Sequence, residues 1–201
     1  RKEAAALALA PPKRVHPCTV AFLNNMALNN AEHIRLLRQF QRRHPDDFFL
    51  NLALAGHLWV RGQGTPGQID EAKGFFRAAL AVRPDNSFVL SDLGRLLSQG
   101  PQTGDEGIAT LERAVQIKPA NHRAYRYLGE AHSKMGRLDE AAAAYRNAIR
   151  AKPTVGFYYL NLGDVLMRMQ AWDDAISVFT EGIRNSSNST ELYFKLGLAY
   201  K

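Results

Sequence analysis

The sequence predicts an all-α protein, an α-solenoid in which antiparallel helix pairs follow one another along the chain. A leucine-glycine pair recurs with its glycines 35, 34 and 34 residues apart, at Leu93-Gly94, Leu128-Gly129, Leu162-Gly163 and Leu196-Gly197. A proline ends successive units, at Pro45, Pro84, Pro119 and Pro153. Between these leucine-glycine pairs and prolines, apolar residues recur at the three- and four-residue spacing of amphipathic helices. A fixed period of this length is typical of stacked helical repeats.

One unit shows why a glycine stands inside a helical pattern. Residues 122–135 are predicted as a first helix and residues 138–151 as a second. A glycine in a helix interior costs about 1 kcal/mol relative to alanine. This cost is recovered if Gly129, with Ala141 opposite, lets the two helix axes approach closely. Gly136 can adopt the left-handed conformation that ends the first helix.

This pattern resembles the tetratricopeptide repeat family, whose motif runs W-x2-L-G-x2-Y, then A-x3-F, then P. Residues 122–155 match it at Tyr125, Leu128, Gly129, His132, Gly136, Ala141, Tyr145, Ala148 and Pro153. Residues 156–189 match it as well, but depart from it at Gln170 and Ser187. The resemblance implies a superhelix, because one helix pair cannot bury its own apolar face and its neighbours must stack on it.

The period divides the whole chain into consecutive segments. "AEHIRLLRQFQRRHP" aligns with "DEGIATLERAVQIKP", which places a degenerate repeat before the first full one. In chain order we expect 1–13, the end of an upstream helix or a linker; 14–47, the degenerate repeat; 48–86, a repeat with an insertion between its helices at 64–68; 87–121, 122–155 and 156–189, three further repeats; and 190–201, the first helix of a truncated repeat or a capping helix.

The amino-acid composition and net charge of the chain limit the kinds of partner that we expect it to bind. No apolar run approaches the roughly 20 residues of a membrane-spanning helix, so we expect no membrane partner. The single cysteine, Cys18, excludes an intrachain disulfide and a CxxC site, which fits a reducing compartment and a cytoplasmic location. The net charge of +7 favours acidic partners, although it could equally serve solubility. The sequence leaves the oligomeric state open.

The resemblance also implies a binding surface. In the family, certain positions of each first helix line a concave groove that binds peptides or proteins. Carried onto this sequence, the residues proposed for that groove are Arg95, Arg123, Arg126, Tyr127, Lys134, Phe157, Asn161, Asp164, Arg168 and Lys195. Their guanidinium groups suit the carboxylates of an acidic peptide, and their rings suit apolar side chains. The alternative is that they are solvated surface charges and ordinary packing between repeats.

Some family members bind a C-terminal dicarboxylate with a Lys, Asn, Asn, Lys, Arg set. Arg126, Asn161 and Lys195 match that set in part. Glu130 and Glu191 occupy two of its other places, where a carboxylate would repel the ligand. The sequence therefore does not predict this clamp.

A second resemblance concerns residues 36–59 and 71–86. "LLRQFQRRHPDDFFLNLALAGHLW" and "EAKGFFRAALAVRPDN" look like the repeat region behind the kinase domain of planctomycete-type bacterial serine/threonine kinases, departing at Phe49, where tryptophan is usual. This implies an alternative function, the regulatory or substrate-docking region of a kinase whose catalytic domain lies outside this chain. The sequence has no Gly-rich loop, VAIK-like lysine, HRD or DFG motif, so the chain itself should not transfer phosphate.

No motif predicts an enzyme, a cofactor or a metal site. The six histidines form no HExxH or paired metal spacing, and His132 takes the place of a packing tyrosine. Adjacent carboxylates such as Asp139-Glu140 stand at expected helix starts, where they act as caps. The arginines of "RQFQRRH" are interpreted as the exposed face of a helix, so we expect no nucleic acid partner. The sequence therefore predicts a non-catalytic scaffold for protein interactions.

Overall fold

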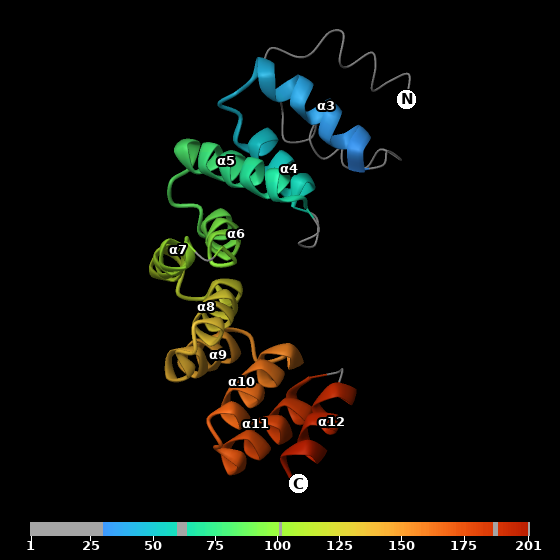
Figure 1. Ribbon diagram of the computed structural model, residues 1–201, viewed down its shortest axis with the longest axis vertical. Helices are drawn as coiled ribbons and strands as arrows, with labels where there is room; N and C mark the ends of the chain where they lie inside the picture. Colours follow the sequence, from blue (N-terminus) through green and yellow to red (C-terminus); the bar gives the residue numbers. More distant parts are fainter. Residues whose placement is uncertain (1–29, 60–63, 101, 187–188, 201) are drawn as a thin grey trace. The chain divides into compact units, whose positions relative to one another are not determined.

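The computed structural model describes residues 30–59, 64–100, 102–186 and 189–200 of the 201-residue chain. Within these ranges all regular secondary structure is α-helical, which confirms the predicted fold class (Figure 1). The helices are α3 (Asn30–Arg43), α4 (Phe48–Leu58), α5 (Pro66–Val82), α6 (Ser87–Leu97), α7 (Gly104–Ile117), α8 (His122–Lys134), α9 (Leu138–Ala151), α10 (Gly156–Arg168), α11 (Trp172–Asn185) and α12 (Thr190–Ala199). No helix among them is long and apolar enough to cross a bilayer. The predicted segment 1–13, residues 14–29 of the degenerate repeat, Cys18 and Ser187 lie outside the described residues.

The chain divides into two compact units, residues 1–89 and 90–201. In the first unit, α3 and α4 enclose a core whose buried members are Leu37, Phe40, Leu50 and Leu54. The guanidinium of Arg83 lies over the ring of Phe48, 4.3 Å from its centroid. The rings of His33 and His57 stack at 4.9 Å beside this core.

Helix α5 begins earlier than the sequence analysis expects. Thr65 is its N-cap, Pro66 occupies the first turn, and the side chain of Gln68 closes a capping box with Thr65. Proline is preorganised for this position, and the capping box satisfies two backbone N–H groups. Residues 66–68 therefore form the first turn of α5, and only residues 64 and 65 of the expected insertion precede the helix.

The predicted helices 122–135 and 138–151 correspond to α8 and α9. Asn121 caps α8 by accepting a hydrogen bond from the backbone N–H of Ala124 at 3.2 Å. Gly136 has a φ of 75°, which confirms its expected left-handed conformation after α8. Gln170, the equivalent residue after α10, also adopts a left-handed φ, of 61°.

The glycines of three Leu-Gly pairs mark the close approach of each first helix to its partner. A Cβ atom on Gly129 would lie 2.7 Å from the ring of Tyr145, and one on Gly163 would lie still closer to the ring of Phe179. The predicted close approach is confirmed. However, the side chain that fills the space above Gly129 is the ring of Tyr145, while Ala141 is fully buried one turn away.

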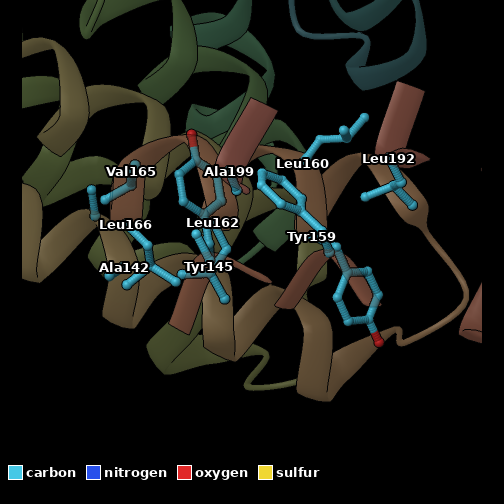
Figure 2. Close-up of a cluster of buried hydrophobic side chains, with 12 residues drawn as sticks. Ala142, Tyr145, Tyr159, Leu160, Leu162, Val165, Leu166, Leu192 and Ala199 are labelled. Carbon is cyan, nitrogen blue, oxygen red and sulfur yellow. The ribbon is translucent and has the colours of Figure 1, made fainter. Parts of the chain in front are cut away.

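The core of the second unit is shared between successive repeats. Figure 2 shows Tyr145 of α9, Tyr159 and Leu162 of α10 and Leu192 of α12 within one buried cluster. Tyr159 is fully buried, and its hydroxyl accepts a hydrogen bond from Asn185 Nδ2 at 2.9 Å. Because side chains of α9, α10 and α12 share this cluster, neighbouring repeats stabilise one another.

Candidate functional site

Side chains on the first helices of successive repeats meet in a row across the second unit. Three of the contacts across this row join residues that are 31 positions apart, three fewer than the repeat length. A residue on one first helix therefore contacts a residue that lies one helical turn before the equivalent position in the next repeat. The contacts are Arg123 Nη2 to Asp92 Oδ1 at 2.6 Å, Arg126 Cζ over the Phe157 ring at 5.7 Å, and Lys195 Nζ to Asp164 Oδ1 at 2.7 Å.

Three guanidinium groups gather over one buried tyrosine at the centre of this row. Tyr127 is 2% exposed. The Cζ atoms of Arg126, Arg95 and Arg123 lie 4.2, 4.9 and 5.9 Å from its ring centroid. The negative face of an aromatic ring attracts a cation by about 0.5–1 kcal/mol at an exposed site, and by more when the pair is desolvated. Tyr127 therefore helps to hold three like charges together.

Carboxylates within the chain offset part of this positive charge. Glu130 Oε1 accepts a hydrogen bond from Arg126 Nη1 at 2.8 Å, one helical turn away. Asp92 accepts from Arg123, and burial raises the pKa of Asp92 even though Arg123, Arg95 and Arg126 act in the opposite direction. Arg123 and Arg126 are therefore each paired with a carboxylate of the chain.

Helix α10 contributes a second line of predicted residues. Phe157, Asn161, Asp164 and Arg168 follow one another at spacings of four, three and four residues, so they share one helix face. Phe157 is 48% exposed. Asn161 Nδ2 is buried and has no hydrogen-bond partner among the described residues. Arg168 donates to Ser133 Oγ at 2.5 Å, which joins the ends of α10 and α8.

The structure thus brings nine of the ten predicted residues into this row or onto the same face of α10, and Lys134 stands apart. Lys134 is the last residue of α8, is exposed, and makes no hydrogen bond or ion pair within the described residues. The predicted set did not include Asp92, Glu130 and Ser133, the partners of its arginines. Opposite charges separated by 31 residues, as in Asp92 and Arg123, are the signal that could have identified such pairs.

The described residues hold no group of three or more histidine, cysteine, aspartate or glutamate side chains arranged to bind a metal ion. His122 Nδ1 lies 2.6 Å from the hydroxyl of Tyr158, beside the arginine cluster. Burial, followed by the charges of Lys152, Arg123 and Arg126, lowers the pKa of His122. A neutral His122 therefore adds no charge to the site near pH 7.

Comparisons with known proteins define the class of repeat. Residues 122–155 and residues 159–190 each match a family model described as a tetratricopeptide repeat. These two segments are therefore similar to tetratricopeptide repeats. No curated protein matches the chain.

Solved structures with the same fold include two structures of MamA and one of YrrB. A crystal structure of MamA is 20% identical, covers 78% of this chain and 88% of its own, and has a TM-score of 0.67. A MamA fragment from Desulfovibrio magneticus RS-1 is 21% identical over 91% of this chain and 93% of its own, with a TM-score of 0.69. YrrB, described as a TPR protein with an unusual peptide-binding site, is 16% identical over 92% of this chain and 89% of its own, with a TM-score of 0.67. At these identities the similarity shows the fold, and none of these matches concerns a kinase.

Proposed function

We propose that the chain is a non-catalytic scaffold that binds peptide or protein partners on the surface formed by the first helices of its second unit. The observation that carries the proposal is the cluster of Arg95, Arg123 and Arg126 over Tyr127, next to the half-exposed ring of Phe157. This combination offers cationic donors and an apolar contact within one short stretch of surface. The peptide-binding site described for YrrB, which has the same fold, supports a role of this kind.

The chemistry of the surface favours an acidic residue next to an apolar one in the partner. A guanidinium carries five N–H donors, so its bond to one intrachain carboxylate leaves others for a ligand. The Arg126–Glu130 pair is partly exposed, with side chains 20% and 29% accessible, and such pairs contribute about 0–1 kcal/mol. A partner carboxylate can therefore replace Glu130 at Arg126 at little cost. Phe157, which is 48% exposed, supplies the adjacent apolar contact.

The proposal includes no catalysis, cofactor or metal, and it places the protein in the cytoplasm. It assigns peptide binding to the predicted set, with Asp92 as the carboxylate that holds Arg123 in place. Lys134 at the end of α8 and Lys195 in the middle of α12, where it pairs with Asp164, extend this surface.

The test is peptide selection followed by charge reversal. Peptides selected from a random display library by the wild-type chain are labelled, and their Kd is measured by fluorescence anisotropy. The Arg123→Glu/Arg126→Glu variant should bind them at least about tenfold more weakly, because charge-assisted hydrogen bonds contribute about 1.5–3 kcal/mol. The matched control, Arg146→Glu/Arg150→Glu, makes the same charge change on exposed positions of α9.

Circular dichroism melts establish that the variants remain folded, and Phe157→Ala provides a second, uncharged test of the same surface. Selected peptides that bind Arg123→Glu/Arg126→Glu and Phe157→Ala as tightly as the wild type would place the binding site elsewhere. Equal weakening by the α9 control would show a general charge effect instead.

A second proposal is the regulatory or substrate-docking region of a bacterial kinase, based on the resemblance of residues 36–59 and 71–86. It is compatible with the first, because a docking region also binds proteins. The coding sequence upstream of Arg1 tests it: an upstream reading frame without kinase motifs contradicts it.

A further inference from the structure

The first unit has an open hollow of about 420 Å³ between α3 and the start of α5. Its lining includes Ile34, Arg35, Arg38, Gln39, Arg42 and Gln68. Ligand pockets commonly have volumes of about 300–1,000 Å³. The basic run of α3 was interpreted from the sequence as a solvated helix face, but three of its arginines share this hollow.

The three arginines lie on one face of α3. Arg35, Arg38 and Arg42 are separated by three and four residues, and these spacings place side chains above one another on a helix. At a rise of 1.5 Å per residue, they span about 10 Å along the helix axis. Guanidinium groups this close together can converge on one compact anion.

One of the arginines is held in position by a carboxylate of α5. Arg38 donates from Nε to Glu71 Oε1 at 3.1 Å and from Nη2 to Glu71 Oε2 at 2.6 Å. This bidentate pair fixes the plane of the guanidinium and leaves both N–H groups of Nη1 unused by Glu71. Arg38 is therefore preoriented, with Glu71 as its positioning residue.

The other two arginines are available for a ligand. Arg35 and Arg42 are exposed, and neither makes a hydrogen bond or an ion pair within the part of the chain that the structure describes. Two uncompensated guanidinium groups thus flank the fixed one. Each of these two side chains can bind an anion by donating two parallel N–H hydrogen bonds to it.

The start of α5 adds a neutral donor. Gln68 Oε1 accepts a hydrogen bond from the backbone N–H of Thr65 at 2.8 Å, a contact that does not use the two N–H groups of its amide Nε2. Gln68 lies in the first turn of α5, where the aligned peptide dipoles favour negative charge. Donors from α3 and α5 therefore converge on the same hollow.

We propose that this hollow binds the phosphate monoester of a phosphorylated serine or threonine side chain in a peptide partner. Such a group carries a charge of roughly −1.5 to −2 at pH 7 and three strong acceptor oxygens, which several guanidinium forks can satisfy together. Its size fits the short span of the arginines, and buried Ile34 gives an apolar wall for the adjoining peptide. The site is independent of the peptide surface proposed for the second unit.

The experiment compares two immobilised peptide libraries that are random around a fixed central residue, phosphoserine in one and serine in the other. The wild-type chain should be retained by the phosphoserine library and not by the serine library. Binding to individual retained phosphopeptides should weaken at least about tenfold in Arg35→Gln/Arg42→Gln, since each lost charge-assisted contact costs about tenfold or more. Arg43→Gln, which removes an exposed charge from the same helix outside the hollow, should change Kd by no more than about twofold.

Arg42→Lys keeps the charge but loses the planar fork, so it should weaken binding by an intermediate factor. Melting curves of Arg35→Gln/Arg42→Gln and Arg42→Lys should overlap with the wild type, because Arg35 and Arg42 have no hydrogen bond or ion pair to lose within the described residues. Equal retention by the two libraries, no retention by either, or unchanged binding in Arg35→Gln/Arg42→Gln would overturn the proposal. Binding to duplex DNA or phosphatidylserine vesicles in place of phosphopeptides would overturn it as well.

Discussion

Replacing Gly163 with alanine tests the packing on which the repeat depends. A Cβ atom at this position would overlap the ring of Phe179, which is fully buried. Overpacking of a buried site costs about 1–3 kcal/mol, and the degree of overlap places Gly163→Ala at the upper end. Alanine recovers about 1 kcal/mol through its higher helix propensity. We therefore expect Gly163→Ala to lower the free energy of unfolding by about 2 kcal/mol.

The alanine variants of Gly129 and Gly197 provide two comparisons for the loss in unfolding free energy that we expect for Gly163→Ala. At Gly129 the nearest ring atoms of Tyr145 would lie 2.7 Å from the new Cβ atom, so a smaller loss of about 1 kcal/mol is expected. Gly197 holds the equivalent place in the last leucine-glycine pair, but no atom of another helix lies within 4 Å of the position that its Cβ would take. Gly197→Ala should therefore stabilise the chain by about 0.5–1 kcal/mol.

The assay is urea denaturation followed by circular dichroism at 222 nm. The expected order of stability is Gly197→Ala, wild type, Gly129→Ala and Gly163→Ala. Truncation of the opposing ring in Gly163→Ala/Phe179→Leu should recover part of the loss, because it removes the overlap. If Gly163→Ala stabilises the chain as much as Gly197→Ala does, the close approach of α10 and α11 is not what selects the glycine.

Two further predictions concern backbone strain and pH. Gln170→Gly should raise the free energy of unfolding by about 0.5–1 kcal/mol. The left-handed φ of 61° costs a non-glycine residue about 1–2 kcal/mol, and the greater entropy of glycine in the unfolded chain offsets part of the gain. A lower urea midpoint than that of the wild type would contradict this prediction. Burial, followed by the charge of His33, lowers the pKa of His57 below 6.5, so the unfolded state binds more protons and stability should fall as the pH drops below 6.5. Urea titrations of the full chain should show this slope between pH 7 and pH 5, and His57→Gln should reduce it. A slope that is the same in the wild type and in His57→Gln would rule out His57 as its source.

The helix pairs could be predicted from the sequence because their signals are local. Gly136 and Pro153 stand at the ends of α8 and α9, and the apolar spacing between them needs no tertiary information. The start of α5 was missed for a local reason too. Its proline and glycine were interpreted as a loop insertion, although threonine followed three residues later by glutamine is a capping box.

The candidate sites could be predicted only in part. The family pattern placed Arg123, Arg126 and Tyr127 on one face, and the structure brings them together. It did not identify the carboxylates that pair with the arginines, because an ion pair depends on the register between neighbouring repeats and on side-chain rotamers. The hollow beside α3 was missed because Arg38 and Glu71 belong to different helices, and only their packing creates a concave surface.

The amino-acid sequence by itself determined the period, the helix pairs and the positions where small residues permit close packing, since these follow from spacing and backbone preference. The tertiary structure alone decided which ring occupies the space above each glycine, which charges neutralise one another across repeats, and which arginines keep unused donors. The physical reason is that burial and charge pairing depend on distances of a few ångströms between residues about 30 positions apart. Periodicity brings such residues to neighbouring turns, but only the packed side chains set their contacts.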